Sequence, residues 1–335
     1  MGSKNFNDLP EENGIKKTFS PEDHRIDLSK NIPDPEPIFS ISGVTLCSAG
    51  NIKTIKAKQK GAKTTLVSVF VTSNFLGSYL TITSHQKKQI AWIDSEQSIN
   101  QIYKIARRTH RLCGIPEDKN NDALQIFFAR ELDLTQRWEL FESLLESTEN
   151  EIIILDVATD WVNDINDIGE TKQAVDRILK GASIYKKLII CTIHENKNDK
   201  NATGHFGGSL QKKSEAVISL SKENGVFTVS ATDTRHGDWP DFSFIFDPEG
   251  LPVGIDTPIK LSTSERNELE RSANITAILS GVRLNYTELV ERYIPRSGKA
   301  ERTAKRHISN AIKSGHIRIQ SDGRYILSKY SNEEN

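Results

Sequence analysis

The segment from Ala57 to Thr64 has the residue types of a loop that binds phosphate groups. Its sequence, AKQKGAKT, ends in Lys-Thr, as does the phosphate-loop pattern G-x-x-x-x-G-K-[ST]. A strand-like segment precedes it and a helical pattern follows it. Both pattern glycines are alanines, Ala57 and Ala62, and Gly61 stands one place early, so a lysine-rich surface loop remains the alternative. The candidate nucleotide-binding residues are Ala57, Lys58, Gln59, Lys60, Gly61, Ala62, Lys63, Thr64 and Thr65.

Two acidic residues follow apolar strand-like runs and could complete a phosphate-transfer site. Asp156 ends the run EIIILD, where a carboxylate can hold Mg²⁺ through water. Glu96 follows the run IAWID and could polarise an attacking water, with Asp94 as the second choice. A solvated acid at a strand end is the alternative for each. The order of Lys63, Glu96 and Asp156 along the chain favours the chemical interpretation.

The elements that must position these residues alternate between apolar strands and amphipathic helices. This alternation is typical of βαβ units and predicts an α/β fold with a mainly parallel sheet. After residue 194 the pattern changes to a polar loop followed by successive strands, which we expect to be antiparallel. The predicted strands are 38–42, 44–47, 52–55, 90–94, 124–129, 152–155, 188–193, 216–220, 226–231 and 242–246, and the predicted helices are 64–75, 98–113, 134–145 and 171–185.

Composition excludes several classes of protein. The chain has 335 residues, of which 36% are hydrophobic and 27% charged, so it is neither fibrous nor wholly disordered. No apolar run approaches the ~20 residues that cross a bilayer. The three cysteines, Cys47, Cys113 and Cys191, match no metal-ligand spacing and are predicted to be reduced thiols. We therefore expect a cytoplasmic protein without a membrane partner.

The end of the chain is basic although the net charge of the whole is −1. Residues 262–330 contain 13 lysines and arginines against 7 acidic residues. Two amphipathic segments, 265–279 and 286–293, precede a basic helix at 299–314 and a hairpin formed by 317–319 and 325–327. Three helices followed by a two-stranded wing predict a C-terminal winged helix-turn-helix domain.

This basic unit is a candidate DNA-binding surface. Apolar Ala304 and Ile308 predict the buried face of the basic helix, and cations recur on another face. A solvated charged face is the alternative, and winged helices also dock onto proteins. The candidate DNA-binding residues in this unit are Arg296, Lys299, Arg302, Lys305, Arg306, Lys313 and Arg324, with Arg318 also in the wing.

With these features the chain resembles RecA-like P-loop ATPases. It is most similar to plasmid replicative helicases of the RepA type and to AAA-family ATPases of Bacteroidetes mobile elements. The resemblance runs from about residue 37 to residue 250 and departs from the family at both loop glycines. It rests on segments 50–64, 93–97, 152–156, 193–197, 204–208 and 234–237, taken in this order and spacing.

The resemblance implies a role for each site residue. Lys63 would contact the β- and γ-phosphates of ATP, and Thr64 would bind Mg²⁺ with Asp156 behind it. Glu96 would be the general base. His194 would sense the γ-phosphate, although a hydrogen-bonded histidine at a strand end is the alternative.

Two further segments take their roles from the same resemblance. Arg235 would be an arginine finger that reaches a neighbouring subunit, with a surface arginine in a turn as the alternative. The family often has a lysine where this chain has Asp233. The loop 196–208 would line a channel for single-stranded DNA, and a mobile solvent loop is its alternative. Its candidate DNA-binding residues are Lys197, Lys200, His205 and Phe206.

Together these features predict an organisation and a function. We expect an N-terminal arm over residues 1–36, an ATPase domain over 37–252, a linker over 253–261, a winged-helix domain over 262–330 and a tail over 331–335. The predicted function is a DNA-dependent ATPase that uses ATP and Mg²⁺, forms a homo-oligomeric ring, and replicates or mobilises a mobile element. The alternatives are a nucleotide sensor that does not hydrolyse ATP and a helicase loader.

Overall fold

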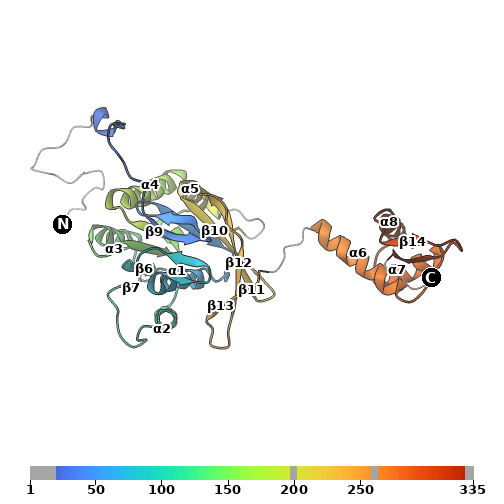
Figure 1. Ribbon diagram of the computed structural model, residues 1–335. Helices are drawn as coiled ribbons and strands as arrows, with labels where there is room; N and C mark the ends of the chain where they lie inside the picture. Colours follow the sequence, from blue (N-terminus) through green and yellow to red (C-terminus); the bar gives the residue numbers. More distant parts are fainter. Residues whose placement is uncertain (1–19, 197–201, 258–262, 329–335) are drawn as a thin grey trace, which may run out of the picture. The chain divides into compact units, whose positions relative to one another are not determined.

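The structure is a computed structural model that describes residues 20–196, 202–257 and 263–328 (Figure 1). It divides into two compact units between Thr257 and Pro258, which we call unit 1 and unit 2. Among the described helices, none combines the length and apolarity needed to cross a bilayer. Cys47, Cys113 and Cys191 are buried free thiols.

Unit 1 is built on a nine-stranded sheet with the order β13-β12-β11-β10-β3-β9-β8-β6-β7. The six strands from β10 to β7 in this order are parallel, and β11, β12 and β13 continue the sheet antiparallel to their neighbours. This topology confirms the α/β class. The strands are β3 (Ile52–Ala57), β6 (Ile90–Asp94), β7 (Leu124–Phe128), β8 (Ile152–Asp156), β9 (Leu188–His194), β10 (Ala216–Glu223), β11 (Val226–Thr234), β12 (Phe242–Phe246) and β13 (Pro252–Ile255).

Helices cover both faces of this sheet (Figure 1). Because side chains alternate along a strand, Ile152 and Ile154 of β8 pack on one face and Ile153 and Leu155 on the other. One core contains α1 (Lys63–Leu76) and α2 (Ile99–Leu112). The opposite core contains α3 (Leu134–Glu146), α4 (Ile168–Tyr185) and α5 (Gly204–Lys213).

Helix α1 is buried almost all round because a second sheet packs beside it. This sheet is antiparallel, has the order β2-β1-β5-β4, and contacts α1 through β4 and β5. Ser68, Thr72 and Ser73 donate hydrogen bonds to carbonyls four residues earlier, which satisfies these buried hydroxyls. The strands are β1 (Pro37–Ile41), β2 (Val44–Ser48), β4 (Ser78–Tyr79) and β5 (Ile82–Ser84), and two short 3₁₀ helices, η1 (Pro21–His24) and η2 (Ala158–Trp161), complete unit 1.

Two sequence predictions about the secondary structure of unit 1 are wrong. Strand β13 pairs antiparallel with β12 through residues 252–255, most of which we predicted to be linker. The predicted channel loop 196–208 ends early, because α5 begins at Gly204. Gly204 has a φ of 70°, a conformation that favours glycine, and an added Cβ there would lie 2.9 Å from the Ile165 carbonyl oxygen.

Unit 2 contains α6 (Thr263–Leu279), α7 (Tyr286–Ser297) and α8 (Glu301–Lys313), followed by β14 (Ile317–Ile319) and β15 (Tyr325–Leu327). The two strands pair antiparallel. The three helices share a core with the hairpin, in which Ile275, Leu289 and Ile308 are fully buried. Asn285 and Glu288 form a capping box that starts α7, and Gly298 ends it with a φ of 64°.

Candidate functional site

The candidate site lies where four parallel strands of unit 1 end together. Strands β3 and β9 are paired so that Ala57 lies opposite His194, and β6 and β8 so that Asp94 lies opposite Asp156. Parallel strands present their carboxyl ends at one edge of the sheet, where ligands of α/β proteins bind. This topology brings together residues that are far apart in the sequence.

The loop from Ala57 to Ala62 turns sharply between β3 and α1. Lys60 and Ala62 both adopt the left-handed conformation, with φ values of 59° and 63°. Gly61 is needed for a different reason: an added Cβ would lie 2.7 Å from the Lys58 carbonyl oxygen and 2.9 Å from the Ala57 Cβ. The glycine one place early therefore allows a close approach of the backbone, whereas Ala62 bears the strain of the left-handed turn.

The first turn of α1 points its backbone N–H groups toward this edge. Ala62 precedes the helix and gives it no side-chain cap, and no acidic residue lies in the first turn. An uncapped helix N-terminus carries partial positive charge and free donors, which suit a phosphate group. The backbone here is therefore chemically matched to a phosphate ligand.

We expect Ala62→Gly to raise the free energy of unfolding by about 0.5–1 kcal/mol, because glycine adopts a φ of 63° without the Cβ clash of alanine. Urea denaturation of both proteins measures the change. As the matched control, Gly61→Ala should lower stability, since its new methyl group would meet the Lys58 carbonyl. A loss of stability in Ala62→Gly would contradict this account of the loop.

Lys63, His194 and Glu96 form a chain of polar contacts beside the loop. The Lys63 Nζ lies 2.9 Å from His194 Nδ1, and His194 Nε2 lies 3.8 Å from a Glu96 carboxylate oxygen. Burial lowers the pKa of Lys63, and burial together with the charge of Lys63 lowers the pKa of His194. Because an ammonium group only donates, Nδ1 accepts, and neutral His194 carries its proton on Nε2, toward Glu96.

Asp156 is a buried acid of the site, and only one of its two carboxylate oxygens has a hydrogen-bond partner among the described residues. Its Oδ1 accepts a 2.6 Å hydrogen bond from the Thr192 hydroxyl, and Thr64 also hydrogen-bonds the carboxyl group. Its Oδ2 is buried without a hydrogen-bond partner among the described residues. Burial raises the pKa of Asp156 despite these hydrogen bonds and the nearby Lys63. An unpartnered carboxylate oxygen beside a threonine hydroxyl fits the oxygen ligands that Mg²⁺ prefers.

Asp94 holds the turn that presents Glu96. Its Oδ1 accepts the backbone N–H groups of Glu96 at 3.1 Å and Gln97 at 2.8 Å. Burial, reinforced by the charge of Asp156, raises the pKa of Asp94 to about 7. Asp94 is fully buried whereas the Glu96 side chain is 39% exposed, so Glu96 is the acid that can reach a water molecule.

Arg235 and His205 do not join this cluster. Arg235 is exposed just after the end of β11. The last residue of β11, Thr234, pairs with Ala216 of β10, which in turn pairs with Lys53 near the start of β3. Arg235 therefore lies at the end of the sheet opposite to the loop. His205 is exposed on the first turn of α5. Lys197 and Lys200 lie outside the described residues.

The prediction that Phe206 stacks on a DNA base is wrong. Its side chain is 0% exposed in the core between α5 and the sheet, and its backbone N–H donates to the Ile165 carbonyl. A base could reach the ring only if this core opened. The composition of the segment, rich in glycine and polar residues, concealed the start of a helix.

The basic residues predicted for unit 2 are all at its surface. Along α8, Ala304, Ile308 and Ala311 are buried, while Arg302, Lys305, Arg306 and Lys313 are exposed. Lys305 is paired with Glu301 at 2.6 Å. We call the exposed side of α8 with Arg302, Arg306 and Lys313 the outer face of α8. Arg296, Lys299, Arg318 and Arg324 are exposed as well.

Sequence reasoning did not single out Thr192 or Asp160. Thr192 is the polar residue inside the apolar run LIICTIH, a local signal that marks a buried hydroxyl with a specific partner. Asp160 lies in η2 and hydrogen-bonds Ser95, and burial raises the pKa of its carboxyl group. The sequence gives no spacing rule that links Asp160 to Glu96.

No family model matches the sequence, and no curated protein matches it. A solved structure described as the RadB recombinase aligns with a TM-score of 0.44 and 14% sequence identity, covering 60% of this chain and 90% of that chain.

Proposed function

We propose that this chain is a DNA-dependent ATPase of the RecA-like helicase type. The observation that carries the proposal is the convergence of Lys63, Thr64, Glu96 and Asp156 at the uncapped N-terminus of α1. The charges of Glu96 and Asp156 both act on Lys63, so the four groups share one small region. This is the set needed to bind a triphosphate, hold a magnesium ion and activate water.

The residues of the chain have distinct roles in this proposal. Lys63 and the first backbone N–H groups of α1 would bind the phosphates. Thr64 and Asp156 would hold Mg²⁺, which neutralises charge on the phosphate oxygens when bound. Glu96, fixed by Asp94, would accept a proton from water.

His194 is suited to transmit the state of the site. Lys63 would exchange its hydrogen bond with His194 for a phosphate oxygen, which removes the positive neighbour that lowers the pKa of His194. Glu195 follows His194 directly and donates its backbone N–H to the Ala57 carbonyl of the loop. His194 would therefore couple nucleotide binding to the segment after β9.

Arg235 would act between copies of the chain. It is exposed and lies at the end of β11, away from the loop of its own chain. In this proposal it contacts the nucleotide of a neighbouring copy in a homo-oligomeric ring, where a guanidinium stabilises charge on the phosphate oxygens.

Unit 2 would be a winged helix that contacts DNA. Three helices with a common core and an antiparallel hairpin support this assignment, and the outer face of α8 presents cations to a phosphate backbone. We assign the whole chain to the replication or mobilisation of a mobile element, as the resemblance to RepA-type helicases implies.

The test is ATP hydrolysis by the purified full chain, with Mg²⁺, in the presence and absence of single-stranded DNA. Hydrolysis that DNA stimulates supports the motor. Nucleotide binding with no hydrolysis under either condition would contradict it and favour the nucleotide sensor. Hydrolysis that ignores DNA would contradict the DNA-dependent part of the proposal.

A further inference from the structure

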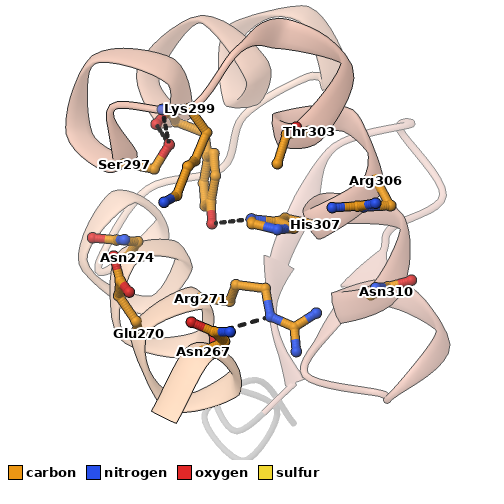
Figure 2. A pocket seen from close by; sticks show the side chains of 11 residues that line it. Asn267, Glu270, Arg271, Asn274, Ser297, Lys299, Thr303, Arg306, His307 and Asn310 are labelled. Carbon is orange, nitrogen blue, oxygen red and sulfur yellow. Dashed lines mark hydrogen bonds between the residues drawn. The ribbon is translucent and has the colours of Figure 1, made fainter. Parts of the chain in front are cut away.

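Unit 2 contains a groove that extends beyond the outer face of α8 to α6 and α7 (Figure 2). One hollow of about 520 Å³ lies among α6, α7 and α8, and an adjoining hollow of about 370 Å³ lies between α6 and α8. Arg271, His307 and Asn310 line both hollows, so the two form one elongated depression. We call it the α6–α8 groove.

Four cations border this groove: Arg271, Lys299, Arg306 and Lys313. The acids along it are Glu268 and Glu270, which leaves an excess of positive charge. Among the side chains that the structure describes, no carboxylate forms an ion pair with Arg271, Lys299 or Arg306, whereas Lys305 on the same helix is paired.

The groove also holds its polar groups in fixed positions. The Arg271 Nε donates to the Asn267 carbonyl at 3.0 Å, which fixes one edge of the guanidinium group and leaves its other nitrogens in the groove (Figure 2). The Tyr293 hydroxyl lies 3.0 Å from His307 Nδ1. Burial, followed by the charges of Arg271, Arg306 and Lys299, lowers the pKa of His307. An anion in the groove would relieve this crowding of positive charge.

The shape and the donors identify the ligand. Guanidinium groups match phosphate oxygens, and the amides of Asn267, Asn274 and Asn310 add neutral donors. Cations distributed along an elongated groove match a row of phosphates better than a single compact anion. A nucleic-acid backbone has this repeat of charge.

We propose that the α6–α8 groove binds the phosphodiester backbone of DNA, through Arg271, Lys299 and Arg306. This inference rests on the proposed DNA-binding function and extends it. Unit 2 then holds DNA along two adjoining rows of contacts, the outer face of α8 and the groove, which share Arg306 and Lys313.

The experiment measures the affinity of the full chain for a fluorescently labelled DNA duplex by anisotropy, over a series of salt concentrations. Arg271→Gln removes the groove cation of α6. We expect it to weaken binding by roughly 5–10-fold and to reduce the slope of log K against log salt by about one. The matched control is Arg283→Gln, an exposed arginine of unit 2 outside the groove, which should change affinity less than about 2-fold.

A third variant separates failure of the groove from failure of the proposed function. Arg302→Gln probes the outer face of α8. If Arg302→Gln weakens binding and Arg271→Gln matches the control, the groove proposal is overturned while DNA binding by α8 stands. If Arg271→Gln instead weakens binding of labelled ATP and leaves DNA affinity unchanged, the groove binds a free nucleotide and the proposal is also overturned. Thermal melting of each variant confirms that it is folded.

Discussion

Replacing Glu96 with glutamine is expected to slow ATP hydrolysis by about 10²–10⁴-fold and to leave ATP binding nearly unchanged. The amide keeps the shape of the side chain and its place after Asp94, but it cannot accept a proton from water. Lys63, Thr64 and Asp156, which would bind the nucleotide and its ion, are untouched. Phosphate release measures hydrolysis, and isothermal titration measures binding.

The control for this prediction is Glu249→Gln, an exposed acid in the turn between β12 and β13. It removes the same charge and should hydrolyse ATP at the rate of the unmodified chain. If Glu96→Gln retains more than about a tenth of the activity, Glu96 is not the general base. Asp94, which is buried and hydrogen-bonded to the turn, would then need to be tested by Asp94→Asn.

Replacing Lys53 with methionine is expected to raise the free energy of unfolding by about 2–3 kcal/mol at pH 7. Lys53 lies at the start of β3, is 0% exposed, and its Nζ has no hydrogen-bond partner among the described residues. Burial lowers its pKa to about 8, so the folded chain must bury an ammonium group at pH 7. Methionine fills similar space without a charge.

The charges of Cys47 and Glu215 oppose the effect of burial on Lys53 only in part. Glu215, whose charge acts on Lys53, already accepts hydrogen bonds from the backbone N–H and the hydroxyl of Ser48, at 2.8 and 2.7 Å. His236 lies 2.8 Å from the same carboxylate. The Phe70 ring, 5.3 Å from Nζ, offers a weaker cation–π contact.

The same prediction has a pH dependence with a definite sign. The pKa of Lys53 is about 8 in the folded chain, whereas that of a solvent-exposed lysine, as in the unfolded chain, is 10.5. Between these values the unfolded chain therefore binds more protons than the folded chain. Stability rises with pH as a result, by about 1 kcal/mol from pH 7 to pH 9 for this group. The difference in free energy of unfolding between the original chain and Lys53→Met should therefore be smaller at pH 9 than at pH 7 by that amount.

Urea denaturation of both proteins at pH 7 and pH 9 measures these effects. Lys212→Met, at an exposed position of α5, is the control and should change stability by less than about 0.5 kcal/mol. If Lys53→Met is less stable than the original chain at pH 7, the ammonium group is stabilised by its surroundings and the account of this residue is wrong.

Much of the fold was predictable because its signals are local. The runs IIILD and LIICTIH are short, apolar on both faces and rich in isoleucine, which favours central strands, and the intervening helices have apolar stripes that cover them. Strands β4 and β5 have two and three residues, too few for a periodic pattern. Strand β13 begins at Pro252, and proline is typical of a turn as well as of an edge strand.

The candidate site was predictable in its residues but not in its connections. The phosphate-loop pattern predicts Lys63, and the end of an apolar strand-like run predicts Asp156. The contact between Lys63 and His194 depends on β9 lying next to β3, and that of Thr192 with Asp156 on β9 lying next to β8, although β9 comes later in the chain than both. Strand order arises from packing of the whole sheet, which no local pattern encodes. The prediction for Phe206 was wrong for a related reason, since the burial of its side chain depends on α5 covering the sheet.

Equilibrium binding of Mg²⁺-ATP to the full chain and to Lys63→Met tests the central claim most directly. The claim is that a triphosphate is held at the start of α1 by Lys63, although Ala57 and Ala62 replace two glycines. We predict that the original chain binds Mg²⁺-ATP and that Lys63→Met binds at least about tenfold more weakly, because a charged hydrogen bond is lost. Equal affinities for the two proteins, or no binding by the original chain, would contradict the claim.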